Sequence, residues 1–191
     1  MKKAEVSAYD PNWIKLFEAE RNVFFELLSK EIINIFHIGS TSIPNMCAKP
    51  IIDLLIEVKD ISNIDQYQTQ CEALGYTYLG EYGIPNRRYL EKEIDGLPQY
   101  HIHIFPYGDP EIKKHLHFKR YVIEHHEAFI AYRDTKIEGA DHFKNDREKY
   151  QEHKSKIIQE INEKAASLYQ NSLTPMRKTK KLLTYFECVE I

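Results

Sequence analysis

The chain has 191 residues, of which 42% are apolar and 29% charged, and its formal net charge at pH 7 is −3. This length fits one domain with a full hydrophobic core, and the composition is that of an ordinary globular protein. The weak negative charge gives no overall attraction to nucleic acid or to anionic lipid, so we expect neither a long polynucleotide nor a membrane as partner. No apolar run approaches the roughly 18 residues of a membrane-spanning helix.

Cysteine spacing and the N-terminus indicate the compartment. Cys47, Cys71 and Cys188 have no C-x-x-C spacing, which argues against a disulfide framework and against a structural zinc site. The first ten residues contain two lysines with no apolar segment behind them, which is unlike a secretory signal. We therefore expect a cytoplasmic protein.

The N-terminal half predicts a helix followed by strands. Asp10-Pro11 is a typical helix start, and apolar residues recur at helical spacing after it, so we expect a helix from residue 11 to about 30. The further elements expected here are strands at 34–38 and 51–58, a helix at 63–74 ended by Gly75, and a strand at 76–81.

The C-terminal half predicts a hairpin and two long helices. Strands are expected at 86–94 and 99–105, joined by the turn dipeptide Asp95-Gly96. One helix is expected from 111 to about 136, a break at 138–145, and a second helix from 146 to about 169. We expect one domain at 1–169 and a tail at 170–191, whose apolar end could add a strand to the sheet or pair with a second copy in a homodimer.

Asp53 stands out because it interrupts the apolar strand expected at 51–58. Strand alternation puts Ile51, Asp53, Leu55 and Glu57 on one face and their neighbours on the other. A carboxylate in so apolar a strand is costly unless it is paired, hydrogen-bonded or bound to metal. Before this strand lies the small-residue loop 39–42, Gly-Ser-Thr-Ser, whose backbone N–H groups could point at an anion.

The segment HIGSTSIPNMCAKPIIDLLIEV (37–58) resembles the signature of the GrpB family, whose biochemical role is poorly defined. Its Gly39-Ser40 pair, twelve intervening residues and Asp53 resemble the core motif of the nucleotidyltransferase superfamily. Further resemblance lies in Arg87-Arg88-Tyr89, in His101-Ile102-His103 and in the segment 115–136, so it spans roughly residues 9–168. The resemblance implies an α+β fold with a mixed sheet flanked by helices, a loop that holds a triphosphate, and acids that bind a divalent metal.

One position departs from the superfamily pattern. Two acids at i and i+2 of a strand lie about 6.6 Å apart and can share an ion, but here the second position is Leu55. Glu57 lies about 13 Å along the strand, too far to substitute directly. His101 and His103 share a face and could ligate one metal, with Asp53 completing a three-ligand site.

The expected site follows from these residues. Gly39, Ser40, Thr41 and Lys49 are the candidate phosphate contacts, and Arg87 or Arg88 would neutralise the phosphate; regular alternation admits only one of the two arginines, and we favour Arg87. Asp53, His101 and His103 are the candidate catalytic residues and metal ligands for Mg²⁺, Mn²⁺ or Zn²⁺, and the histidines could instead transfer protons.

Simpler roles for the same residues remain open. Gly39-Ser40 could be only a turn, Asp53 could cap a helix or pair with an arginine, and His101 and His103 could serve packing and hydrogen bonding. The remaining histidines of the helical region are expected at the surface or at an interface: His115, His117, His125, His126 and His142.

Three functions are compatible with this pattern. The first is an enzyme that transfers a nucleotidyl or phosphoryl group from a nucleoside triphosphate to a small acceptor with the help of a metal. The second is a non-catalytic module that binds a nucleotide or another anion, and the third is a metal-dependent phosphohydrolase that uses the His-x-His pair. A fold alone does not separate these three.

Overall fold

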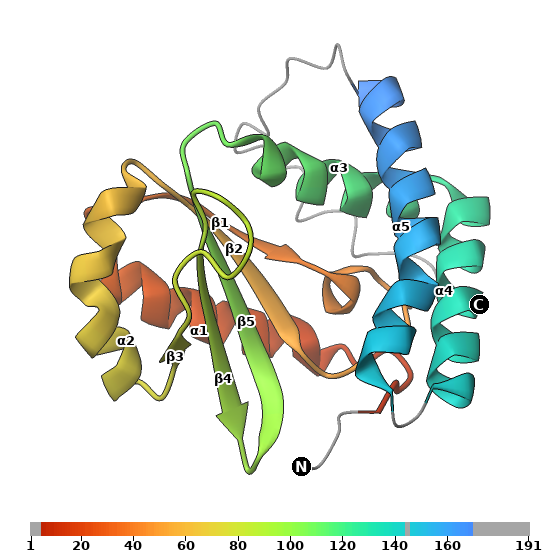
Figure 1. Cartoon of the computed structure of the whole chain (residues 1–191), viewed down its shortest axis with the longest axis horizontal. Helices are drawn as coiled ribbons and strands as arrows, with labels where there is room; N and C mark the ends of the chain where they lie inside the picture. The colour runs from red at the N-terminus through yellow and green to blue at the C-terminus, as the bar shows by residue number, and fades with distance from the viewer. Residues whose placement is uncertain (1–4, 144–145, 170–191) are drawn as a thin grey trace.

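The computed structural model describes residues 5–143 and 146–169 as a five-stranded sheet with helices on both faces (Figure 1). The elements are α1 (Asn12–Leu27), β1 (Ile32–Ile38), the 3-10 helix η1 (Ser40–Ser42), β2 (Ile52–Val58), the 3-10 helix η2 (Ile61–Tyr67), α2 (Gln68–Ala73), β3 (Thr77–Tyr78), β4 (Arg88–Ile94), β5 (Leu97–Pro106), α3 (Pro110–Glu124), α4 (His126–His142) and α5 (Arg147–Tyr169). This architecture confirms the predicted α+β class.

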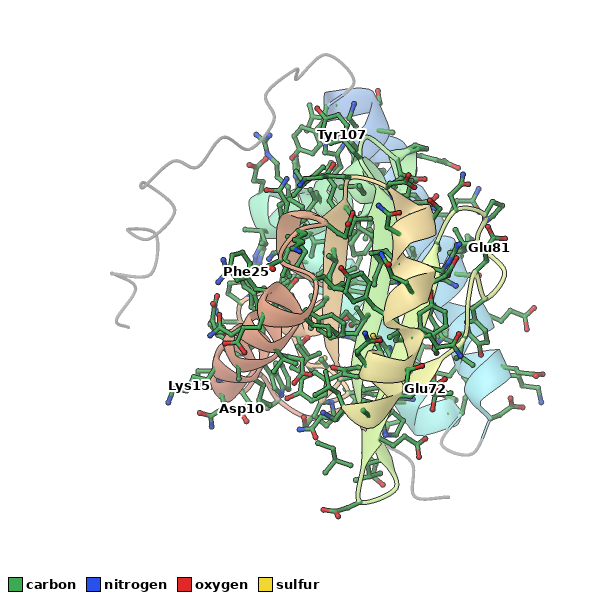
Figure 2. The ribbon with its side chains drawn as sticks, turned by 90° about the vertical axis from the view of Figure 1, so that its left-hand side faces the viewer. Asp10, Lys15, Phe25, Glu72, Glu81 and Tyr107 are labelled. Carbon is green, nitrogen blue, oxygen red and sulfur yellow. The ribbon has the colours of Figure 1, made fainter. Side chains whose placement is uncertain are left out.

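The strand order is β1-β2-β5-β4-β3, with β2 antiparallel to β1 and parallel to β5. The predicted alternation along β2 is confirmed, because Ile52, Leu54, Ile56 and Val58 pack with α1 while Leu55 packs with α3. Figure 2 shows α1 and α2 in front of the sheet, with α3, α4 and α5 behind it. The sheet therefore has an α1 face and an α3 face, and Asp53 lies on the α3 face.

Local signals in the sequence are confirmed at two turns. At the start of α1, Asp10 accepts a hydrogen bond from the backbone N–H of Asn12, at 2.9 Å. Asp95 and Gly96 form the two-residue turn between β4 and β5, and both have positive φ, 54° and 75°. Asparagine, aspartate and glycine tolerate that conformation best, which is why this dipeptide predicts a tight hairpin.

The single helix predicted from 111 to 136 is wrong, because the chain turns at His125 between α3 and α4. His125 has extended backbone angles, φ −121° and ψ 100°, and its ring stacks on Tyr121. No proline or glycine marks the turn, so a local pattern could not reveal it. Three helices, α3, α4 and α5, therefore stand where two were expected.

The break predicted at 138–145 begins later than expected, because α4 continues to His142 and α5 begins at Arg147. Gly139 lies inside α4, where a Cβ atom would be 2.8 Å from Cδ2 of His153 and 3.2 Å from Cδ2 of Tyr150. The glycine therefore serves the close approach of α4 to α5 and does not end the helix.

Two smaller predictions are corrected. The helix expected at 63–74 is 3-10 helix up to Tyr67 and α-helix only from Gln68, and the strand expected at 76–81 is limited to Thr77–Tyr78. The tail 170–191, with its predicted strand, lies outside the described residues. Among the residues described, no helix has the length and apolar character needed to cross a membrane.

Candidate functional site

Asp53 is the centre of a polar cluster on the α3 face of the sheet. Because β2 and β5 are parallel neighbours, Asp53 lies opposite His101 in the register. His101 Nδ1 is 3.1 Å from Asp53 Oδ1, and His103 Nε2 is 3.9 Å from the same oxygen. Burial alone would raise the pKa of Asp53, but the hydrogen bond from His101 and the nearby imidazole of His103 outweigh it and hold the pKa well below its usual range. The carboxylate is therefore ionised.

Gly39 packs directly against this carboxylate. Its φ is +69°, and a Cβ atom at this position would lie 2.2 Å from Asp53 Oδ2. Any side chain would have to displace the acid, and the backbone conformation is one that only glycine adopts easily. Ser40 and the twelve residues after it separate Gly39 from Asp53 in the sequence. In the structure the glycine and the carboxylate are in direct contact.

The hydroxyl groups of the loop are already used by the protein. Thr41 is 1% exposed, and its Oγ1 donates to the Ile51 carbonyl at 3.0 Å. Ser42 Oγ donates to the Gly39 carbonyl at 2.7 Å, and Ser40 Oγ lies 3.0 Å from the hydroxyl of Tyr132 in α4. Thr41 therefore shapes the loop, and Ser40 joins the loop to α4.

The two adjacent arginines lie on opposite sides of the sheet. Arg87 NH1 lies 3.4 Å from Nδ1 of His103, whereas Arg88 donates to the carboxylate of Asp65 at 2.5 and 2.8 Å. A guanidinium only donates, so Nδ1 of His103 accepts and its ring proton is on Nε2, on the side of Asp53. Arg87 belongs to the cluster, and Arg88 does not.

The remaining charged candidates lie in other contacts. The ammonium of Lys49 is 4.6 Å from the ring centroid of Tyr150 in α5. Glu57 accepts from Asn34 Nδ2 at 2.6 Å and from the Gly108 N–H at 3.3 Å. Leu55 is fully buried, so a core side chain fills the position at which the superfamily carries its second acid.

His115 of α3 is a member of the cluster that sequence reasoning missed. We expected His115 at the surface or at an interface; it is half-buried, and its ring centroid is 5.7 Å from that of His103. Burial, and next the neighbouring His103, lower the pKa of His115 to about 4. A signal existed, since His115 is three residues after the buried Ile112 and so lies on the same face of a helix.

Two lysines, one in α3 and one in α4, also connect the helices to this region. Lys119 of α3 donates to the carbonyl of His37 at 2.9 Å, and burial lowers its pKa to about 8. Lys136 of α4 is 2% exposed and donates to the carbonyl of Cys47, and burial is the main reason that its pKa falls to about 7. Both lysines lay inside the predicted helix, and nothing in the local pattern indicated their contacts with His37 and Cys47.

The cluster is not a closed metal cage. Within residues 5–143 and 146–169, no group of three or more His, Cys, Asp or Glu side chains is arranged to hold a metal ion. A surface hollow between α3 and α5, lined by Lys114 and by residues such as Ser155 and Glu163, contains none of the cluster residues. The groups available for chemistry at Asp53 are therefore one ionised carboxylate and two imidazoles, with Gly39 and Arg87 beside them.

Comparison with known proteins identifies the family of the chain. A family model described as GrpB protein matches residues 3–164. The chain belongs to the GrpB family. The UPF0157 protein BH1888 of Halalkalibacterium halodurans is 33% identical to this GrpB chain over 159 residues, which cover 82% of the chain and 80% of the relative.

Two further relatives extend this comparison. The crystal structure of the conserved protein GrpB from Enterococcus faecalis aligns with a TM-score of 0.83 and 36% identity, over 86% of this GrpB chain and 99% of that one. The UPF0157 protein YqkA of Bacillus subtilis is 44% identical over 124 residues, and the match spans 65% of this chain but only 36% of YqkA. The names of these relatives state no reaction, so any function must be argued from the site.

Proposed function

We propose that this GrpB-family protein binds a nucleoside triphosphate at Asp53 and transfers a nucleotidyl or phosphoryl group from it to a small acceptor. One observation carries the proposal: the ionised Asp53 carboxylate lies against Gly39 and is bonded to the imidazole of His101. In the nucleotidyltransferase superfamily, which this segment resembles, a glycine-serine loop holds the triphosphate and two acids on the next strand bind the metal; this chain has the loop and the first of the two acids.

A divalent ion would arrive with the nucleotide. Mg²⁺ usually binds proteins through one or two carboxylates together with substrate phosphates, so the single acid at Asp53 meets that need without a protein cage. Mn²⁺ could use the same oxygen, and Zn²⁺ would favour the imidazoles of His101 and His103. When bound, such an ion polarises a phosphoryl oxygen.

The imidazole of His101 supplies a base. With its Nδ1 proton directed at Asp53, its Nε2 can take the proton of an acceptor hydroxyl while the acceptor oxygen bonds to phosphorus. The bond from phosphorus to the leaving group breaks at the same time and releases pyrophosphate in nucleotidyl transfer, or a nucleoside diphosphate in phosphoryl transfer. The Asp53 carboxylate would stabilise the imidazolium that forms.

A second function is favoured by Leu55. Because a buried leucine fills the position of the second acid, the protein could bind a nucleotide and lack the transfer reaction. Such a module would keep its affinity in the presence of a chelator and would release no pyrophosphate. The phosphohydrolase hypothesis, based on His101 and His103, predicts release of inorganic phosphate without any acceptor.

The test is a thermal-shift screen of nucleotides with and without Mg²⁺ and Mn²⁺, followed by assays of pyrophosphate and phosphate release. At a hundredfold excess over Kd, a bound nucleotide should stabilise the wild type by about 2.7 kcal/mol. Asp53→Asn should remove this stabilisation, and Asp65→Asn, whose acid pairs with Arg88 on the other face, should keep it. If no nucleotide shifts the wild type, both the transferase and the binding module are excluded.

A further inference from the structure

Tyr82 is an exposed aromatic residue in the loop between β3 and β4. Its side chain is 59% exposed, and its backbone adopts a positive φ of 44°, which is strained for a residue other than glycine. One face of its ring stacks on Tyr89 of β4, with 5.0 Å between centroids and 8° between planes. The protein thus holds a tyrosine ring at its surface in a defined orientation.

One residue, Tyr89, lies between the Tyr82 ring and the candidate site. Tyr89 is 6% exposed and lies opposite His103 in the register of β4 and β5. Its ring centroid is 5.1 Å from that of His103 and 5.7 Å from that of His101. A continuous row of rings therefore leads from the surface at Tyr82 to the two imidazoles beside Asp53.

Arg87 fixes the position of Tyr82. Its side chain is 6% exposed, its NH2 donates to the Tyr82 carbonyl at 2.6 Å, and its Nε donates to the Glu81 carbonyl at 3.2 Å. The Asn86 N–H also donates to the carboxylate of Glu81, at 2.8 Å. A loop held in this way presents its ring without an ordering cost on binding.

We propose that Tyr82 is the stacking platform for a planar ring of the ligand, the base of the nucleotide whose phosphates lie at Asp53. The inference rests on the function proposed above and names the part of the ligand that the loop recognises. Stacking on an aromatic face tolerates every base, so no single base should be required. Purines should bind more tightly than pyrimidines because stacking strength differs between bases.

The surroundings of Tyr82 favour a small planar ligand over a protein partner. Tyr107 and Phe25 are also exposed, at 72% and 54%, but Figure 2 shows both of them well apart from Glu81, the neighbour of Tyr82. An exposed ring that adjoins a cluster of polar groups is typical of a ligand site, whereas a protein interface needs a wider apolar patch.

The experiment measures the affinity of the full chain for ATP and for inorganic triphosphate, by calorimetry with Mg²⁺ present. Tyr82→Ala should weaken ATP binding roughly 5- to 150-fold and leave the affinity for triphosphate unchanged, because only the base uses the ring. Tyr82→Trp should retain or improve the affinity for ATP. Tyr107→Ala is the matched control, and it should leave both affinities unchanged.

The experiment distinguishes a failure of the Tyr82 platform from a failure of the proposed function. If Tyr82→Ala binds ATP as the wild type does, or loses ATP and triphosphate equally, the platform is wrong and the triphosphate site stands. The platform is equally wrong if the wild type binds ATP no more tightly than triphosphate. If the wild type binds neither compound, the proposed function fails and the platform fails with it.

Discussion

The two faces of the sheet are built from the same strands and differ in chemistry. On the α1 face, β2 contributes Ile52, Leu54, Ile56 and Val58, all fully buried against α1. On the α3 face, the alternate residues of the same strand include Asp53 and Glu57. Because side chains alternate along a strand, one segment can anchor a hydrophobic core on one side and hold an ionised acid on the other.

The polar contacts of the two faces differ as well. On the α1 face, the buried Glu20 accepts a short hydrogen bond from Tyr76, at 2.5 Å, and lies 3.9 Å from the ammonium of Lys92. On the α3 face, Lys119 joins the end of β1 to α3, and Tyr132 and Lys136 join the segment that follows Gly39 to α4. Regions held by a few polar contacts open more easily than a dry core, so we expect the α1 face to dominate global stability.

The largest effect should come from Leu54→Ala, which removes a fully buried side chain from the α1 face. The cavity should lower the free energy of unfolding by about 2–5 kcal/mol, as measured by urea denaturation. The exposed Leu74 supplies the control, because Leu74→Ala leaves no cavity and should change stability little. A loss of less than about 1 kcal/mol in Leu54→Ala would contradict the leading role of this face.

The pH dependence of stability should reveal the lowered pKa of the buried Lys136, which lies away from the α1 face. Burial lowers its pKa to about 7 in the folded protein, whereas the unfolded chain has a pKa near the ordinary value of 10.5. Between these values the unfolded state binds more protons, so the free energy of unfolding should rise with pH relative to Lys136→Met. The difference should total a few kcal/mol, at about 1.4 kcal/mol per unit of pKa shift.

This measurement compares urea denaturation of the wild type and of Lys136→Met from pH 6 to pH 10. The difference between the two proteins should level off as the pH falls from 7 toward 6, because Lys136 is then increasingly charged in both the folded and the unfolded state. Parallel curves across the whole range would show that the lysine is not desolvated in solution.

A smaller loss of stability, with a large loss of function, should follow Gly39→Ala. The positive φ disfavours alanine by roughly 1–3 kcal/mol, and the added Cβ must displace the Asp53 carboxylate. Any nucleotide binding should be lost even where the protein remains folded, as judged by circular dichroism. Gly96→Ala is the control: its φ of 75° carries a similar strain, but no atom lies within 4 Å of the added Cβ, so binding should persist.

Much of the fold could be predicted because it depends on local patterns. The face that Asp53 occupies follows from strand alternation, the hairpin follows from Asp95-Gly96, and α1 follows from Asp10-Pro11 and its apolar periodicity. Membership of the GrpB family, suggested by the segment 37–58, is likewise confirmed. The functional roles of Asp53, His101 and His103 remain predictions.

The incorrect predictions share one physical reason: contacts between segments far apart in the sequence determine these features. The turn at His125 has no helix breaker, and Gly139 is required by packing against α5. The arrival of His115 and Lys136 at the site depends on where α3 and α4 lie, which no local pattern encodes.

The sequence by itself determined the family, the α+β class and the face of β2 that carries the acid, since each depends on residue spacing along one segment. Only the tertiary structure decided that Gly39 touches Asp53, that Arg87 and not Arg88 joins the cluster, and that His115 lies beside His103. These contacts join residues far apart in the chain, and such contacts are set by how strands and helices pack together.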